Sequence, residues 1–137
     1  MQSIMFTKYL RELDIPSLIE ALSSAGVEGA DLCVRPGYPV NPANVQEALP
    51  QAAEQFAEAG LSIPLVTTPT NLNRPDIDDV VSLYAACAEA GVANIKVGYW
   101  PWSTEDDYWQ RVKEVRADLE GFAELSRDYG VRTCIHN

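Results

Sequence analysis

The sequence predicts an α/β fold with about five parallel strands and four helices. The end of a predicted helix, a glycine and an apolar residue recur in that order at Gly26, Gly60, Gly91 and Gly130. Glycine suits the left-handed position just past a helix, because it has no Cβ. The spacing of about 30 to 40 residues is the length of one βα unit. Regular βα alternation indicates a parallel sheet with right-handed crossovers.

Each strand and helix follows from a local pattern. Short apolar, β-prone runs predict strands at residues 3–6, 29–34, 61–67, 92–97 and 131–135. Apolar residues at helical spacing predict helices at residues 14–24, 44–59, 76–90 and 103–129. No linker or low-complexity segment interrupts them, so we expect one domain over residues 1–137.

Three local features refine the predicted helices. Pro50 predicts a kink in the second helix, or a helix that begins near Pro50. Ser103 and Asp106 resemble a capping box at the start of the fourth helix. Gly121 lies inside that helix at a cost of about 1 kcal/mol relative to alanine, so we expect a tight packing contact there.

Composition excludes several classes of function. The formal charge of −10 repels nucleic acid and anionic membranes at long range. No apolar run reaches the roughly 18 residues of a membrane helix, and residues 1–10 lack the features of a signal peptide. Cys33, Cys87 and Cys134 are far apart and odd in number. We expect them to be reduced core residues of a cytoplasmic protein.

The two architectures that fit this alternation are an open doubly wound sheet and part of a (β/α)8 TIM barrel. The glycine-rich GxGxxG turn of dinucleotide-binding sheets does not follow the first strand, and no GxxxxGK[ST] loop is present. A complete barrel takes about 250 residues. These observations favour a partial (β/α)8 TIM barrel.

Several short motifs resemble the xylose isomerase-like TIM barrel superfamily, in the sugar phosphate isomerase/epimerase type. They occur in the expected order and span nearly the whole chain. The motifs are GVEGADL (26–32), VRPG (34–37), LPQA (49–52), EAGLSIP (58–64), AGV (90–92), KVGYW (96–100) and YGV (129–131). The resemblance implies the N-terminal part of an enzyme that moves a proton or hydride between adjacent carbons of a sugar or polyol, with a divalent metal.

The resemblance also implies a metal ligand at the end of the fifth strand. Relatives carry an E-N-H motif there, in which the glutamate binds the metal. In this chain His136 takes the glutamate position and Asn137 the asparagine position. Imidazole binds Mn, Zn, Co or Fe but suits Mg poorly. The other ligands of relatives come from later strands, so we expect an incomplete metal site and a chain that is inactive alone.

The carboxyl ends of the predicted strands carry the candidate site residues. Arg35 is a candidate clamp for a carboxylate or phosphate, or a surface residue of a rigid turn. Lys96 is a candidate catalytic residue that holds a sugar oxygen or phosphate. Tyr99, Trp100 and Trp102 are candidates for stacking on a sugar ring, or for packing at the barrel rim or an interface.

Four further residues have two interpretations each. His136 is a candidate catalytic base and metal ligand, since imidazole titrates near neutral pH, or a solvated histidine. Thr67, with Thr68 beside it, offers hydroxyls to a polyol or belongs to a turn. Asp31 is expected to form an ion pair with Lys96, or to bind a sugar hydroxyl.

Two other functions remain open on the sequence. One is an endonuclease IV-like metal-dependent hydrolase from the same superfamily, which the acidic balance disfavours. The other is a non-catalytic βα module that binds a ligand or partner through an open sheet edge. Because the first and fifth strands would be unpaired edges, we also expect that the chain can form homo-oligomers through them.

Overall fold

The computed structural model describes residues 2–136, and within them the predicted βα alternation is confirmed. A short 3-10 helix after the first strand was not expected. The elements are β1 (Ile4–Phe6), the 3-10 helix (Thr7–Leu10), α1 (Ile15–Ser24), β2 (Gly29–Cys33), α2 (Val45–Glu58), β3 (Ser62–Thr67), α3 (Asp78–Glu89), β4 (Asn94–Lys96), α4 (Tyr108–Tyr129) and β5 (Arg132–Cys134).

The five strands form one sheet in the order β1-β2-β3-β4-β5, with every neighbouring pair parallel. Each strand is thus added beside the one before it in the chain. A doubly wound sheet would instead reverse its strand order at a switch point. The continuous order confirms the partial barrel and leaves β1 and β5 at the two edges of the sheet.

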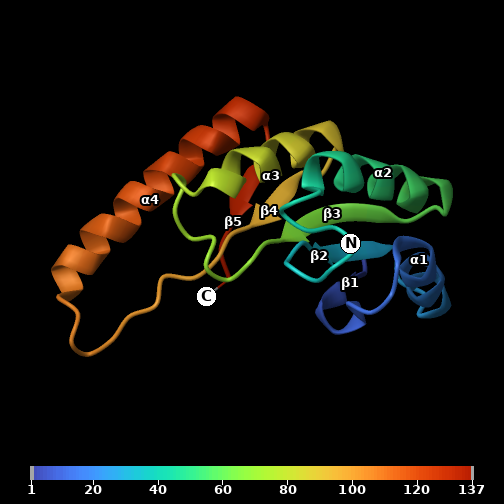
Figure 1. Ribbon diagram of the computed structural model, residues 1–137, viewed down its shortest axis with the longest axis horizontal. Coiled ribbons are helices and arrows are strands. Elements are labelled where there is room, and N and C mark those ends of the chain that lie inside the picture. The colour runs from blue at the N-terminus through green and yellow to red at the C-terminus, as the bar shows by residue number, and fades with distance from the viewer. Residues whose placement is uncertain (1, 137) are drawn as a thin grey trace.

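The two faces of the sheet carry different side chains. Ala30 and Leu32 of β2 and Ile95 of β4 belong to the buried apolar core, which lies between the sheet and the helices. Figure 1 shows α2, α3 and α4 together on one side of the sheet. Because strand side chains alternate between faces, Asp31 and Lys96 belong to the opposite face. That face carries the polar side chains of the candidate site.

The glycine pattern is confirmed. Gly26, Gly60, Gly91 and Gly130 all have left-handed backbone, with φ between 68° and 74°. The expected contact of Gly121 is also present, because a Cβ at this position would meet the Pro75 ring at 2.5 Å. The loop before α3 therefore approaches α4 closely.

The expected start of the fourth helix at residue 103 is wrong, whereas the second helix begins within one residue of its expected start at residue 44. Helix α4 begins at Tyr108, where the side chain of Asp107 accepts a hydrogen bond from the Gln110 amide at 2.8 Å. Ser103 and Asp106 form the expected hydrogen bond, but in a separate turn before the helix. Helix α2 begins at Val45, so a start near Pro50 is excluded and the proline lies inside the helix.

The segment before α4 and the first turns of that helix extend beyond the sheet in Figure 1. Phe122 is the buried residue of α4, whereas Tyr108 and Trp109 are 57% and 71% exposed. No helix within residues 2–136 is both long and apolar enough to cross a membrane.

Candidate active site

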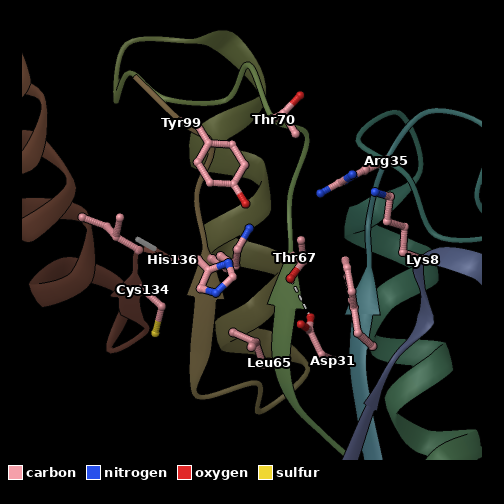
Figure 2. Close-up of a pocket in the computed structure, with 12 residues that line it drawn as sticks. Lys8, Asp31, Arg35, Leu65, Thr67, Thr70, Tyr99, Cys134 and His136 are labelled. Carbon is pink, nitrogen blue, oxygen red and sulfur yellow. Dashed lines mark hydrogen bonds between the residues drawn. The ribbon is translucent and has the colours of Figure 1, made fainter. Parts of the chain in front are cut away.

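A cavity of about 440 Å3 opens at the carboxyl ends of the strands. Ligand sites of parallel α/β proteins occur at this end. Figure 2 shows the residues that line it. Six of the candidate residues named from the sequence meet there: Asp31, Arg35, Thr67, Lys96, Tyr99 and His136. Six others complete the lining: Phe6, Lys8, Leu65, Thr70, Cys134 and Ile135.

Strand register explains why side chains distant in sequence converge. Thr67 of β3 pairs with Lys96 of β4, and Lys96 pairs with Cys134 of β5. Paired residues of parallel strands project from the same face of the sheet. The three side chains therefore form a row across the floor of the cavity.

Asp31 lies in the cavity without the ion pair expected with Lys96. Its Oδ1 atom instead accepts a hydrogen bond from the Thr67 hydroxyl at 2.6 Å, drawn as the dashed line in Figure 2. Among residues 2–136 no ion pair involves Asp31. Burial raises the pKa of this carboxyl, and the Thr67 bond and the charges of Lys96 and Arg35 only partly oppose that effect. Asp31 is thus a half-buried carboxylate with spare acceptor capacity.

A hydrogen bond to the backbone of Thr68 holds the Arg35 side chain at the mouth of the cavity. Its Nε donates to the Thr68 carbonyl at 3.0 Å. Thr68 is buried, and its hydroxyl donates to the Lys96 carbonyl at 2.9 Å. Thr68 therefore joins the ends of β3 and β4, since its amide also donates to the Lys96 carbonyl at 3.0 Å. The bond to Nε fixes Arg35 while its two terminal nitrogens stay available for a ligand.

Lys8 reaches the mouth because the 3-10 helix is tied to β2 and the following loop. The buried Thr7 hydroxyl accepts a hydrogen bond from the Cys33 amide at 2.9 Å. The Tyr38 hydroxyl donates to the Lys8 carbonyl at 2.7 Å. Figure 2 places Lys8 and Arg35 on the same side of the cavity, across from Tyr99 and His136.

Backbone hydrogen bonds hold Tyr99 just beyond the end of β4. Its amide donates to the Thr70 carbonyl at 2.9 Å, and the Gly98 amide donates to the Leu72 carbonyl at 2.7 Å. The Lys96 ammonium lies 4.8 Å from the centre of the Tyr99 ring. This is cation–π distance, so the ring keeps the ammonium at the mouth.

The structure does not bring Trp100 and Trp102 to the cavity. The Trp100 indole donates to Asp118 at 2.8 Å and packs edge-on against Phe122. Trp102 is 55% exposed and borders an apolar hollow on α4 with Tyr108. After Tyr99 the chain leaves the mouth and runs along α4. This route takes the indole rings of Trp100 and Trp102 away from the cavity.

A metal site is incomplete among the described residues. His136 is exposed at the mouth, and Asp31 and Cys134 line the same cavity. Yet residues 2–136 contain no group of three or more His, Cys, Asp or Glu side chains that could hold a metal ion. Asn137, expected at the family's asparagine position, lies outside the described residues. The donor set present does not fit a complete metal centre.

Sequence reasoning missed Lys8 and Cys134 as cavity residues. The sequence could have indicated Cys134, because side chains alternate between the two faces of a strand. Cys134 and Arg132 therefore project from one face of β5, and Thr133 projects from the other. The Cys134 thiol and those of Cys33 and Cys87 are free; Cys33 and Cys87 are buried as expected of core residues, whereas Cys134 is only partly buried. Lys8 is the second residue after the first strand, and its place at the mouth depends on a 3-10 helix that was not predicted.

Comparison of the sequence with family models and with curated proteins finds no match. Solved structures do match. A 3-keto-D-glucoside 4-epimerase, YcjR, from E. coli is 12% identical with a TM-score of 0.71, over 98% of this chain and 56% of that one. The IolI protein with a bound zinc atom is 13% identical with a TM-score of 0.72, over 98% and 51%.

An L-ribulose 3-epimerase is 14% identical with a TM-score of 0.68, over 98% of this chain and 48% of that one. The chain thus spans about half the length of the solved structures it matches. At such low identity the likeness concerns the fold. Together with the continuous strand order, it shows that this chain has the fold of a partial (β/α)8 TIM barrel.

Proposed function

We propose that this chain forms the N-terminal part of a sugar or sugar-phosphate isomerase or epimerase. The observation that carries the proposal is the meeting of Lys96, Tyr99, His136 and the Asp31–Thr67 pair in one cavity at the carboxyl mouth. Matched folds that include two sugar epimerases support it.

The cavity offers distinct partners for the two sides of a sugar. Tyr99 and Leu65 present apolar surface to C–H groups, and the Thr70 hydroxyl is exposed at the rim. Asp31 accepts a hydrogen bond from a sugar hydroxyl with the lone pairs that Thr67 leaves unused. These contacts orient a polyol with its reacting carbons toward Lys96.

Isomerisation requires removal of a proton beside a carbonyl and its return to the adjacent carbon or the opposite face. The Lys96 ammonium would donate a hydrogen bond to the oxygen on which negative charge develops. The His136 imidazole would take up and return the proton. The pair supplies one donor and one base at the same cavity. One base can move the proton between adjacent carbons on one face of the sugar while the hydroxyl proton passes to the former carbonyl oxygen, whereas return to the opposite face requires a second acid.

As an alternative to its role as the base, we propose His136 as one ligand of a divalent metal, such as Mn, Zn, Co or Fe, because a metal-bound imidazole has no free lone pair to take up the proton. The other ligands must come from outside residues 2–136, because no three-ligand group is present there. No catalytic step is therefore assigned to the metal, and residues 1–137 alone are expected to turn over sugar slowly or not at all.

Binding rather than turnover tests the proposal. Amide spectra of the 15N-labelled chain are recorded during titration with aldoses and ketoses. We expect shifts at Thr67, Lys96 and Tyr99 that Lys96→Met weakens. Lys113→Met, an exposed lysine on α4, is the matched control and should leave binding unchanged.

A second titration uses Mn2+, whose paramagnetism broadens nearby amide signals. We expect broadening around His136 that His136→Ala abolishes. Failure of both sugar and Mn2+ to affect the cavity would contradict the enzyme proposal. A partner protein bound along β1 or β5 would then favour the non-catalytic module, since both strands are edges of the described sheet.

A further inference from the structure

Positive charge is concentrated in the cavity of a strongly acidic chain. The sequence has ten lysines and arginines against twenty aspartates and glutamates. Three of these cations, Lys8, Arg35 and Lys96, line the cavity, whereas Asp31 is its one carboxylate among the described residues. We call these three residues the cationic cluster. The charge at the mouth is thus opposite in sign to that of the whole chain.

Among the described residues no ion pair involves the cationic cluster, although the Asp31 carboxylate lies in the same cavity. Within residues 2–136, the ion pairs involve Arg11, Arg74 and Arg111 and lie elsewhere. Lys8 and Lys96 instead lie 5.5 Å and 4.8 Å from the centres of tyrosine rings. Aromatic faces orient an ammonium without neutralising it.

The backbone holds this arrangement in place. Arg35 is anchored through Nε to the Thr68 carbonyl, which directs the rest of the guanidinium away from the bond. Lys8 is anchored through its carbonyl to Tyr38. Cations that share one cavity repel each other. An oxyanion that accepts charge-assisted hydrogen bonds from both Arg35 and Lys8 would reduce that repulsion. The planar guanidinium matches the oxygens of phosphate and carboxylate.

We propose that the cavity recognises an oxyanion carried by the sugar, a phosphate or a carboxylate, with Arg35 and Lys8 as its binding pair. This inference rests on the proposed function for the sugar part of the ligand. The anion contact itself requires neither a metal nor turnover. It makes Arg35 and Lys8 specificity-determining residues that select charged over neutral sugars.

The test measures binding to the metal-free chain by calorimetry. The probes are inorganic phosphate, a ketose phosphate, a uronate and a neutral ketose. The double variant Lys8→Gln, Arg35→Gln removes the binding pair. The matched control Lys113→Gln, Arg116→Gln removes the same net charge from exposed positions on α4. We expect the first variant to weaken ketose phosphate or uronate binding about tenfold or more, and the control to leave it nearly unchanged.

The four probes separate the possible sources of the anion. Phosphate preferred over uronate indicates a sugar phosphate, and the reverse indicates a sugar acid. Equal losses in both double variants, or no preference for charged over neutral sugar, would overturn the inference. Neutral sugar binding at the cavity without that preference would leave the isomerase proposal standing. Anion binding that depends on Arg35 and Lys8, with no sugar binding, would remove only the isomerase proposal.

Discussion

Two polar clusters lie on opposite faces of the sheet, and they differ in how their hydrogen-bonding groups are satisfied. On the helix side, Tyr84, Ser126 and Thr133 form what we call the hydroxyl cluster. The Thr133 hydroxyl lies 2.5 Å from that of Tyr84 and 2.6 Å from that of Ser126, and the Thr133 amide donates to Ser126 at 3.1 Å. At the carboxyl mouth, the cationic cluster has no ion pair among the described residues.

This difference separates structural from ligand-binding polar groups. The hydroxyl cluster joins α3, α4 and β5, and its hydroxyl groups form hydrogen bonds with one another inside the fold. Desolvation raises the pKa of the buried Tyr84 to about 12, so its hydroxyl stays protonated and neutral. The mouth instead keeps charged donors accessible. Substitutions should therefore affect stability on the helix side and binding at the mouth.

The largest expected effect is on stability at Tyr84. The ring is fully buried against Phe122 and Tyr129, so Tyr84→Ala should lower the free energy of unfolding by about 3–5 kcal/mol. Tyr84→Phe keeps the ring and loses one hydrogen bond, with a cost of about 1 kcal/mol. Urea unfolding measures both, and Tyr9→Ala is a control because Tyr9 is 87% exposed. Equal costs for Ala and Phe would show that the hydroxyl bonds, not the packing, dominate.

The next largest effect is expected at Gly98, where one substitution should change both stability and sugar binding. A Cβ there would collide with the backbone of Thr70 and Leu72. Gly98→Ala should cost about 1–3 kcal/mol and also weaken sugar binding, because the same contact positions Tyr99.

Gly91→Ala provides the control for Gly98→Ala. Its Cβ would meet nothing within 4 Å, so its cost comes only from the left-handed backbone. We expect Gly91→Ala to lower the unfolding midpoint without changing sugar binding in the same titration. Normal sugar binding by Gly98→Ala would show that the close contact of Gly98 with the backbone of Thr70 and Leu72 does not control binding at the mouth.

The sequence was sufficient for the parts of the fold that depend on local patterns. The left-handed glycines and the βα alternation, such as Gly26 before β2, follow from backbone sterics and periodicity. It was also sufficient to place Arg35 and Lys96 at the mouth, because both adjoin strand ends.

Long-range packing decided the rest. The route of the chain after Tyr99 depends on the Trp100 contacts with Asp118 and Phe122, which no local pattern encodes. Asp31 likewise bonds to Thr67 rather than to Lys96, because β2 lies beside β3 and is separated by it from β4. The hydroxyl cluster was missed for the same reason, since Tyr84 and Thr133 are 49 positions apart.

A smaller effect is expected in the pH dependence of stability. Because burial raises the folded-state pKa of Asp31, its protonated form favours the fold, and that contribution is lost as the pH rises through this pKa. Asp31→Asn keeps an acceptor for Thr67 and should be more stable than wild type at pH 7. The difference should vanish below about pH 3, where the aspartate is itself neutral. Urea unfolding across this pH range measures the difference.

Asp76 gives a control of opposite sign. Its bond to Arg74 lowers the pKa of the carboxyl, so any stability it contributes is lost as the pH falls through that pKa. Asp76→Asn should therefore not be more stable than wild type at pH 7. A destabilised Asp31→Asn at that pH would show that the carboxylate is favourably paired in the folded chain.

The smallest expected change in stability is at the cationic cluster. Lys8→Gln with Arg35→Gln removes cations that have no described ion pair but loses the hydrogen bond from Arg35 Nε to the Thr68 carbonyl, so in phosphate-free buffer the unfolding free energy should fall by no more than about 1 kcal/mol. Adding ketose phosphate should raise the thermal midpoint of wild type, because a ligand that binds only the folded state stabilises it. The variant should show no such rise. A large loss of stability without ligand would mean that these residues hold the fold together, and the contrast between the two faces of the sheet would disappear.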